Sequence, residues 1–227
     1  MALTPLRLDD APPCLLFLPP GTDDVPLVLL GHGAHLSKDD PVMQILAKTL
    51  CRGIPAAVAL MDCPGHGERR DPSVTDDRFE ADIARRMSDA ANYQQVTADW
   101  LDVERAACAV PRVRGPVGYA GFSMGAMFGL AIAHALPSVR AAAFALGGLT
   151  ADDARNRRIR EGAAALADRE ILMLNMTRDE HFPIDGALEV FESIPGPKRM
   201  GVWAGTHVDI PPEAIQQAVE FFRRTLS

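Results

Sequence analysis

The pentapeptide GFSMG at positions 121–125 has the composition of a turn that presents a serine nucleophile. It follows the apolar run 116–120 and precedes an apolar stretch, 126–135, with helical character. A turn that lifts a hydroxyl clear of a sheet strains the serine backbone and favours flanking glycines. The following helix start would bring backbone N–H groups toward a developing oxyanion. Because a serine hydroxyl is hardly ionised at neutral pH, Ser123 would need a base to attack a carbonyl.

The elements around this turn alternate along the chain. Six short apolar runs are predicted to be buried strands: 26–30, 56–61, 116–120, 141–146, 170–174 and 198–203. Apolar residues at helical spacing predict further helices over 40–53, 93–110 and 215–222, and residues 5–18 fit an edge hairpin. This alternation is typical of an α/β fold, a mostly parallel sheet with helices on both faces.

Two charged stretches, 68–91 and 149–169, are longer than a minimal connection requires. Either could overhang the site as a small cap, and either could be an ordinary surface helix. The length and the absence of a linker or repeat predict a single domain over 1–227.

Together these features resemble the α/β-hydrolase family, over nearly the whole chain from about Pro26. The run LLGHGA at 29–34 is similar to the family's His-Gly oxyanion loop. This resemblance implies that backbone N–H groups of Ala34 and Met124 form the oxyanion hole. We expect His32 to be structural and to hold this loop by hydrogen bonds.

A second motif of the family matches at 62–67, where DCPGHG is similar to the D-x-P-G-H-G turn. Its proline and glycines shape a tight turn beside the expected site. For Asp62 and His66 a structural role is the favoured interpretation, with a chemical role as the alternative.

The resemblance also implies an acid and a base on later loops, in the order Ser, Asp, His. The segment TRDEHFP resembles the acid loop and assigns Asp179, which stands four positions before a proline. The segment AGTHV resembles the Gly-x-His loop and assigns His207 as the base. Glu180 and Asp209 are rival carboxylates, but Asp209 is too close to His207 in one loop to reach the ring nitrogen that faces away from the serine.

These assignments predict a serine hydrolase that cleaves a small or medium carboxylic ester through a Ser-His-Asp triad and an acyl-enzyme. The short chain is similar to the small dienelactone-hydrolase-like esterases, although dienelactone hydrolases proper have a cysteine where this chain has Ser123. A thioesterase or an amide or peptide hydrolase would use the same triad. A non-catalytic binding protein of this fold is the alternative from another class, disfavoured because no triad member is missing.

No substrate-binding residue is assigned from the sequence. His35 and His181 lie in the expected site loops, where they either touch substrate or are plain polar surface. The apolar residues near the motifs either line an acyl pocket or belong to the core; they are Phe122, Met124, Met127 and Phe182. His134 is expected to be structural.

Composition limits the partners. The chain has 227 residues and a formal charge of −7, which disfavours nucleic acid and anionic membrane surfaces. Its four cysteines are scattered without a C-x-x-C pair, so neither a metal site nor a cofactor is expected. The early apolar run 15–18 is too short for a signal peptide or a membrane span, which predicts a cytoplasmic protein. The expected partner is a small-molecule ester substrate. The oligomeric state stays open.

Overall fold

The computed structural model describes residues 3–21 and 23–227. Its strands are β1 (Leu6–Arg7), β2 (Cys14–Phe17), β3 (Val25–Gly31), β4 (Ala57–Met61), β5 (Val113–Phe122), β6 (Val139–Ala145), β7 (Glu170–Met176) and β8 (Lys198–Trp203). They form one eight-stranded sheet of order β1-β2-β4-β3-β5-β6-β7-β8. Strands β3 to β8 pair in parallel, whereas β1 and β2 form the antiparallel edge expected for residues 5–18.

The order of the strands determines where in the sheet a candidate site can lie. The chain leaves β3 toward β4 on one side and later returns to β5 on the other side of β3. In an open parallel sheet, such a reversal leaves a crevice outside the carboxyl ends of the two strands. Gly31 at the end of β3 pairs with Gly121 near the end of β5, so the two glycine-rich motifs of the sequence meet there.

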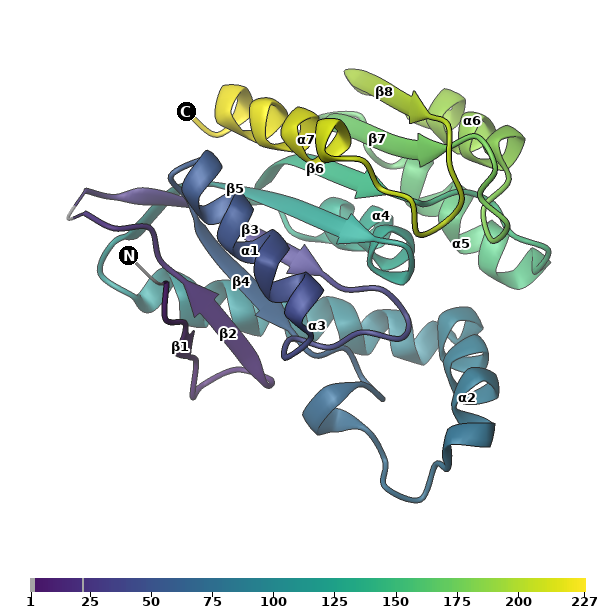
Figure 1. Cartoon of the computed structure of the whole chain (residues 1–227), viewed down its shortest axis with the longest axis horizontal. Coiled ribbons are helices and arrows are strands. Elements are labelled where there is room, and N and C mark those ends of the chain that lie inside the picture. The colour runs from purple at the N-terminus through teal and green to yellow at the C-terminus, as the bar shows by residue number, and fades with distance from the viewer. Residues whose placement is uncertain (1–2, 22) are drawn as a thin grey trace.

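The helices are α1 (Pro41–Gly53), α2 (Asp76–Ser88), α3 (Ala90–Ala109), α4 (Met124–Ala135), α5 (Asp153–Ala164), α6 (Ile184–Ser193) and α7 (Pro212–Thr225), with a short 3-10 turn, η1 (Gly67–Arg69). In Figure 1, α1 and α7 lie in front of the sheet and α3 and α4 behind it. The core is correspondingly divided, with one apolar cluster under α1 and α7 and the other under α2 to α6. This is the predicted α/β-hydrolase fold.

Local sequence signals explain where several helices begin. Asp40 caps α1 by accepting the N–H of Val42 at 2.9 Å, and Pro41 occupies the first helical position. Asp89 caps α3 in the same way, accepting the N–H of Ala91 at 2.9 Å. The charged stretches 68–91 and 149–169 contain α2 and α5. None of the helices in the described residues is long and apolar enough to cross a membrane.

Candidate active site

Ser123 occupies a strained turn between β5 and α4. Its backbone has φ 52° and ψ −112°, a left-handed conformation that side-chain-bearing residues rarely adopt. Its N–H donates to the carbonyl of Ala145 at 2.9 Å, and its own carbonyl accepts the N–H of Ala126 at 2.9 Å. The flanking glycines are required, because a side chain at Gly121 would collide with the backbone of Gly125. The turn therefore has the elbow shape that the sequence predicts.

The side chains of Ser123, His207 and Asp179 form a continuous hydrogen-bonded chain. Nε2 of His207 lies 2.9 Å from Oγ of Ser123, and Nδ1 of His207 lies 2.8 Å from Oδ2 of Asp179. Because an ionised carboxylate only accepts, Nδ1 carries the proton and donates it to Asp179. Nε2 is then free to accept the proton of the Ser123 hydroxyl. The three residues come from loops after β5, β7 and β8.

Asp179 is held rigidly beneath the imidazole. Its side chain is fully buried, and its second oxygen accepts the N–H groups of His181 and Phe182, both at 2.9 Å. Burial acts to raise the pKa of Asp179, but the hydrogen bonds from His207 and from the backbone outweigh it and hold that pKa below its usual value. The carboxylate is therefore ionised and fixed in one orientation.

The two rival carboxylates have other partners. Glu180 accepts the backbone N–H of His207 at 3.1 Å. Asp209 accepts the N–H and the hydroxyl of Thr206, both at 2.8 Å. Among the described residues, neither of these carboxylates forms a hydrogen bond with the His207 ring, and Asp179 is the carboxylate that does.

The loop after β3 is held by two buried histidines. Nδ1 of His32 donates to the carbonyl of Gly33 at 2.7 Å, and its Nε2 accepts the N–H of Cys63 at 3.0 Å. Burial lowers the pKa of His32 to about 3, so the ring is neutral. Nε2 of His66 lies 2.6 Å from the carbonyl of Ala34. These bonds confirm the structural roles expected for His32 and His66.

Two backbone N–H groups of the segments next to Ser123 are without a hydrogen-bond partner among the described residues. Met124 begins α4, so its N–H has no partner within the helix. The loop after β3 passes beside the serine, since a side chain added at Gly33 would start 3.8 Å from Cβ of Ser123. Among the described residues, the N–H groups of Ala34 and Met124 donate no hydrogen bond. They are available to an oxygen bound next to Ser123.

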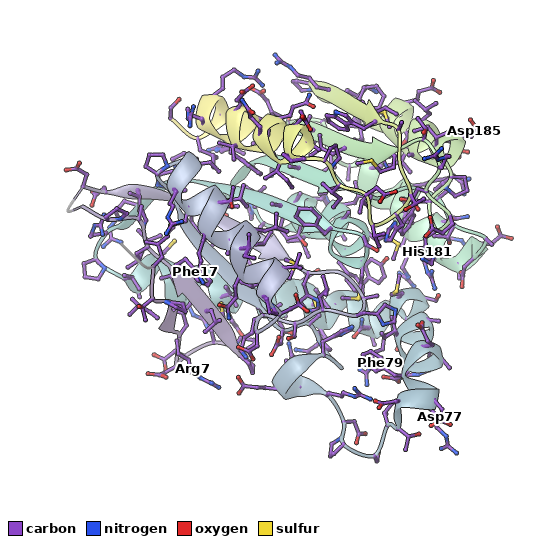
Figure 2. All side chains as sticks on the ribbon, viewed as in Figure 1. Arg7, Phe17, Asp77, Phe79, His181 and Asp185 are labelled. Atoms are coloured by element: carbon purple, nitrogen blue, oxygen red, sulfur yellow. The ribbon has the colours of Figure 1, made fainter. Side chains whose placement is uncertain are left out.

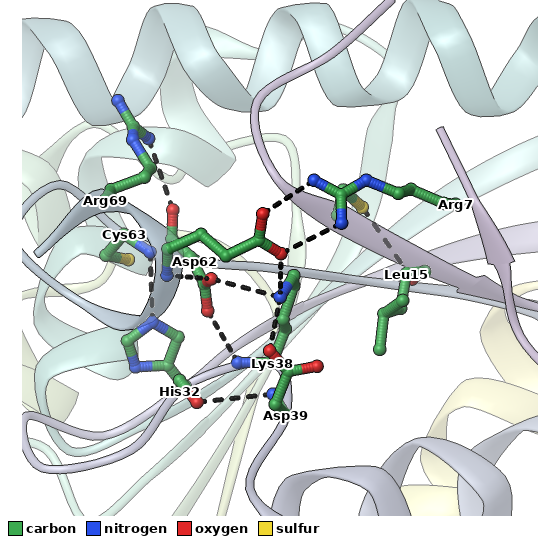
Figure 3. A network of polar contacts seen from close by, with 11 residues as sticks. Arg7, Leu15, His32, Lys38, Asp39, Asp62, Cys63 and Arg69 are labelled. Carbon is green, nitrogen blue, oxygen red and sulfur yellow. Dashed lines mark hydrogen bonds and ion pairs between the residues drawn. The ribbon is translucent and has the colours of Figure 1, made fainter. Parts of the chain in front are cut away.

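Asp62 is structural, as expected, and it organises a buried lysine that the sequence did not reveal (Figure 3). Its carboxylate accepts the backbone N–H groups of Lys38 at 2.7 Å and Glu68 at 3.0 Å. The Lys38 side chain is 1% exposed, and its ammonium lies 2.5 Å from Asp39, 2.6 Å from Glu68 and 3.4 Å from Asp62. These three carboxylates are close enough together to hold a metal ion, but the ammonium of Lys38 already pairs with all three.

A cavity of about 550 Å³ opens over Ser123. Its lining includes the loop after β3, Ile83 and Met87 of α2, and the start of the 149–169 stretch, so both charged stretches contribute a wall. Four residues for which the sequence left a role in the pocket open also line this cavity; they are His35, Phe122, His181 and Phe182. Met127 instead borders a small void between α4 and α5. His181 and Phe79 of α2 lie at the same end of the molecule, to the right in Figure 2.

Comparison with known proteins agrees with this architecture. A cold-adapted esterase from an Arctic intertidal metagenomic library is 26% identical, with a TM-score of 0.79 over 99% of this chain and 93% of that one. Acetyl xylan esterase 1 from Thermoanaerobacterium sp. is 18% identical, with a TM-score of 0.72 over 95% and 79% of the two chains. Dienelactone hydrolase from Anabaena variabilis is 18% identical, with a TM-score of 0.67 over 100% and 98%. At 18% identity the likeness shows the fold alone.

No curated protein matches the sequence significantly. The model of the alpha/beta hydrolase family, however, matches residues 27–222, which is most of the chain. The resemblance to this family that the motifs indicated is confirmed by the match. This chain belongs to the alpha/beta hydrolase family.

Proposed function

We propose that this protein is a serine hydrolase that cleaves a small or medium carboxylic ester through an acyl-enzyme. The observation that carries the proposal is the chain of hydrogen bonds from Ser123 through His207 to Asp179, at 2.9 Å and 2.8 Å. A nucleophile, a base and an orienting acid in mutual contact beside an open cavity are what acyl transfer requires.

In the first half of the reaction, Oγ of Ser123 attacks the ester carbonyl carbon while Nε2 of His207 takes the hydroxyl proton. Asp179 stabilises the imidazolium that forms. The N–H groups of Ala34 and Met124 bind the oxyanion, each lowering the barrier by roughly 3 kcal/mol. The C–O bond then breaks, His207 returns its proton to the departing alkoxide, and an alcohol leaves.

The second half releases the acyl group. Water enters the space left by the alcohol, and His207 removes a proton from it as it attacks the acyl-enzyme carbonyl. The same donors bind the second oxyanion. Collapse of this intermediate returns the proton to Oγ of Ser123 and releases a carboxylic acid, so the enzyme is restored.

An ester of modest size fits the cavity. Its volume of about 550 Å³ lies within the range of roughly 300 to 1,000 Å³ usual for small-molecule sites. Its walls are mostly apolar, and the 26%-identical relative is described as an esterase. We further propose that the chain works as one domain, because both apolar clusters pack on the same sheet.

A panel of p-nitrophenyl esters of rising acyl length, with one thioester and one aminoacyl amide, tests the proposal. We expect hydrolysis of the esters, and loss of that hydrolysis in Ser123→Ala. Preferential cleavage of the thioester or the amide would reassign the substrate class. A wild-type protein that cleaves none of them would favour the non-catalytic alternative.

A further inference from the structure

Arg155 of α5 brings a cation to the wall of the cavity over Ser123. Its guanidinium donates from Nη2 to the carbonyl of Ala84 in α2 at 3.3 Å, while its buried Nε has no hydrogen-bond partner. Among the described residues it forms no ion pair. The arginines of α2 next to it differ, because Arg85 and Arg86 both pair with Asp82 at 2.6 Å.

The nearby carboxylates are engaged elsewhere. Glu80, the acidic residue among the described lining residues, has its Oε1 3.1 Å from Nε2 of His35. Asp152 caps α5 by accepting the backbone N–H of Arg155 at 2.8 Å, and its other oxygen accepts from Ser88 at 3.0 Å. Neither carboxylate reaches the guanidinium within ion-pair distance.

The rest of the cavity wall is largely apolar. Leu36, Leu46, Met87 and Phe182 are typical of its lining. The pKa of Asp152 is lowered by hydrogen bonds from the backbone N–H of Arg155 and from Ser88, and Asp152 is close enough for the charge of Arg155 to contribute as well. Apolar surroundings nevertheless strengthen the interaction of a guanidinium without an ion-pair partner with an anion, because water screens it less there. Planar N–H donors pair most effectively with a carboxylate, which accepts two of them side by side.

We propose that Arg155 binds a carboxylate of the substrate, so that the preferred ester carries a free carboxylate away from the scissile bond. This inference rests on the proposed ester hydrolysis by Ser123. The apolar wall would hold the carbon chain between the ester and the carboxylate. Half-esters of dicarboxylic acids have this chemistry on the acyl side, and esters of hydroxy acids have it on the alcohol side.

Two matched substrate series test the assignment. The first compares mono-p-nitrophenyl esters of dicarboxylic acids of four to eight carbons with p-nitrophenyl esters of monocarboxylic acids of equal length. The second compares the acetate esters of ω-hydroxy acids with those of simple alcohols. In at least one series, Arg155→Gln should lower the ratio of kcat/KM for the anionic over the neutral ester by about tenfold, the scale of a charge-assisted hydrogen bond.

The control is Arg158→Gln, one turn further along α5. Arg158 stacks on Tyr93 at 5.5 Å and lines a different groove, so this variant should keep the wild-type ratio. Arg155→Lys should retain part of the preference. The melting temperature of each variant shows whether a lower ratio reflects weaker substrate binding or a loosened contact between α5 and α2. An unchanged ratio in both series in a folded Arg155→Gln protein would overturn the inference.

A binding measurement separates this inference from the proposed reaction. Glutarate and the neutral amide valeramide, which has the same number of carbons, are titrated into the Ser123→Ala protein by calorimetry, with and without Arg155→Gln. We expect Arg155→Gln to weaken glutarate binding about tenfold and to leave the binding of valeramide unchanged. If no ester is cleaved but glutarate binding depends on Arg155, the reaction is wrong and the carboxylate site stands. If esters are cleaved and Arg155→Gln does not change glutarate binding, only the proposed carboxylate site is wrong.

Discussion

Nε2 of His66 donates to the carbonyl oxygen of Ala34 at 2.6 Å, and this bond ties the turn after β4 to the loop after β3. Phe79 of α2 packs edge-on against the His66 ring, with 5.7 Å between ring centroids. The bond fixes the carbonyl end of Ala34, while the peptide that carries the N–H of Ala34 is held at the Gly33 carbonyl by Nδ1 of His32 at 2.7 Å. The donor's position depends on α2 as well as on the sheet.

Replacing Ala34 by proline tests the proposed oxyanion donor. Proline has no N–H, so a folded Ala34→Pro protein should lose roughly a hundredfold in kcat with a smaller change in KM. Steady-state kinetics on a p-nitrophenyl ester measures both, and circular dichroism checks the fold. Unchanged kcat in a folded protein would remove Ala34 from this role.

Because Asp179 pairs with His207, replacing its carboxylate by an amide is expected to lower kcat strongly. Asp179→Asn keeps the shape but presents an amide to Nδ1, which favours the wrong imidazole tautomer, and kcat should fall by about four orders of magnitude. Asp209→Asn and Glu180→Gln serve as controls and should stay within about tenfold of wild type, since neither carboxylate contacts the ring. A crippled Asp209→Asn beside a normal Asp179→Asn would reassign the third member of the triad.

His32 makes stability depend on pH. Its folded-state pKa of about 3 lies below the unfolded value of about 6.5, so the unfolded chain takes up the proton first as the pH falls. Stability from this group is complete above about pH 6.5 and declines toward pH 3, by about 1.4 kcal/mol per pH unit. Urea unfolding at pH 7 and pH 4.5 should show a loss of about 2 to 3 kcal/mol, and His32→Gln should reduce that difference. Equal pH dependence in the two proteins would be inconsistent with a buried neutral His32.

Replacing the buried Lys38 is expected to lower the free energy of unfolding without a direct effect on catalysis. Burial acts to lower the pKa of Lys38, but hydrogen bonds to Asp39 and Glu68 outweigh it and raise that pKa. Lys38→Met would leave the fully buried Asp62 without a counter-charge and should cost about 3 kcal/mol of unfolding free energy. Urea unfolding measures this loss. The matched control is Arg105→Gln, which breaks the exposed pair with Asp102 and should cost less than about 1 kcal/mol; similar losses in the two variants would contradict the role of Lys38.

Some features could be predicted from the sequence because they follow from local rules. The strands and the elbow at Ser123 depend on apolar runs and glycine, whereas the assignment of His207 depends on the resemblance of its loop to the Gly-x-His loop of the family. Lys38 could not be found in this way, because lysine is normally exposed and its burial depends on Asp62 and Glu68, which lie in the turn after β4, as well as on the neighbouring Asp39. Arg155 could not be assigned from the sequence, since only the packing of α5 against α2 brings it to the cavity.

The proposed reaction depends on Ser123 as the nucleophile. A fluorophosphonate reacts with a serine only where a base activates it, so mass spectrometry of the labelled, digested protein tests this role directly. We expect one adduct, on the peptide that contains Ser123, in the wild-type protein and no adduct in a folded Ser123→Ala variant. An adduct on another residue, or labelling that persists in Ser123→Ala, would contradict it.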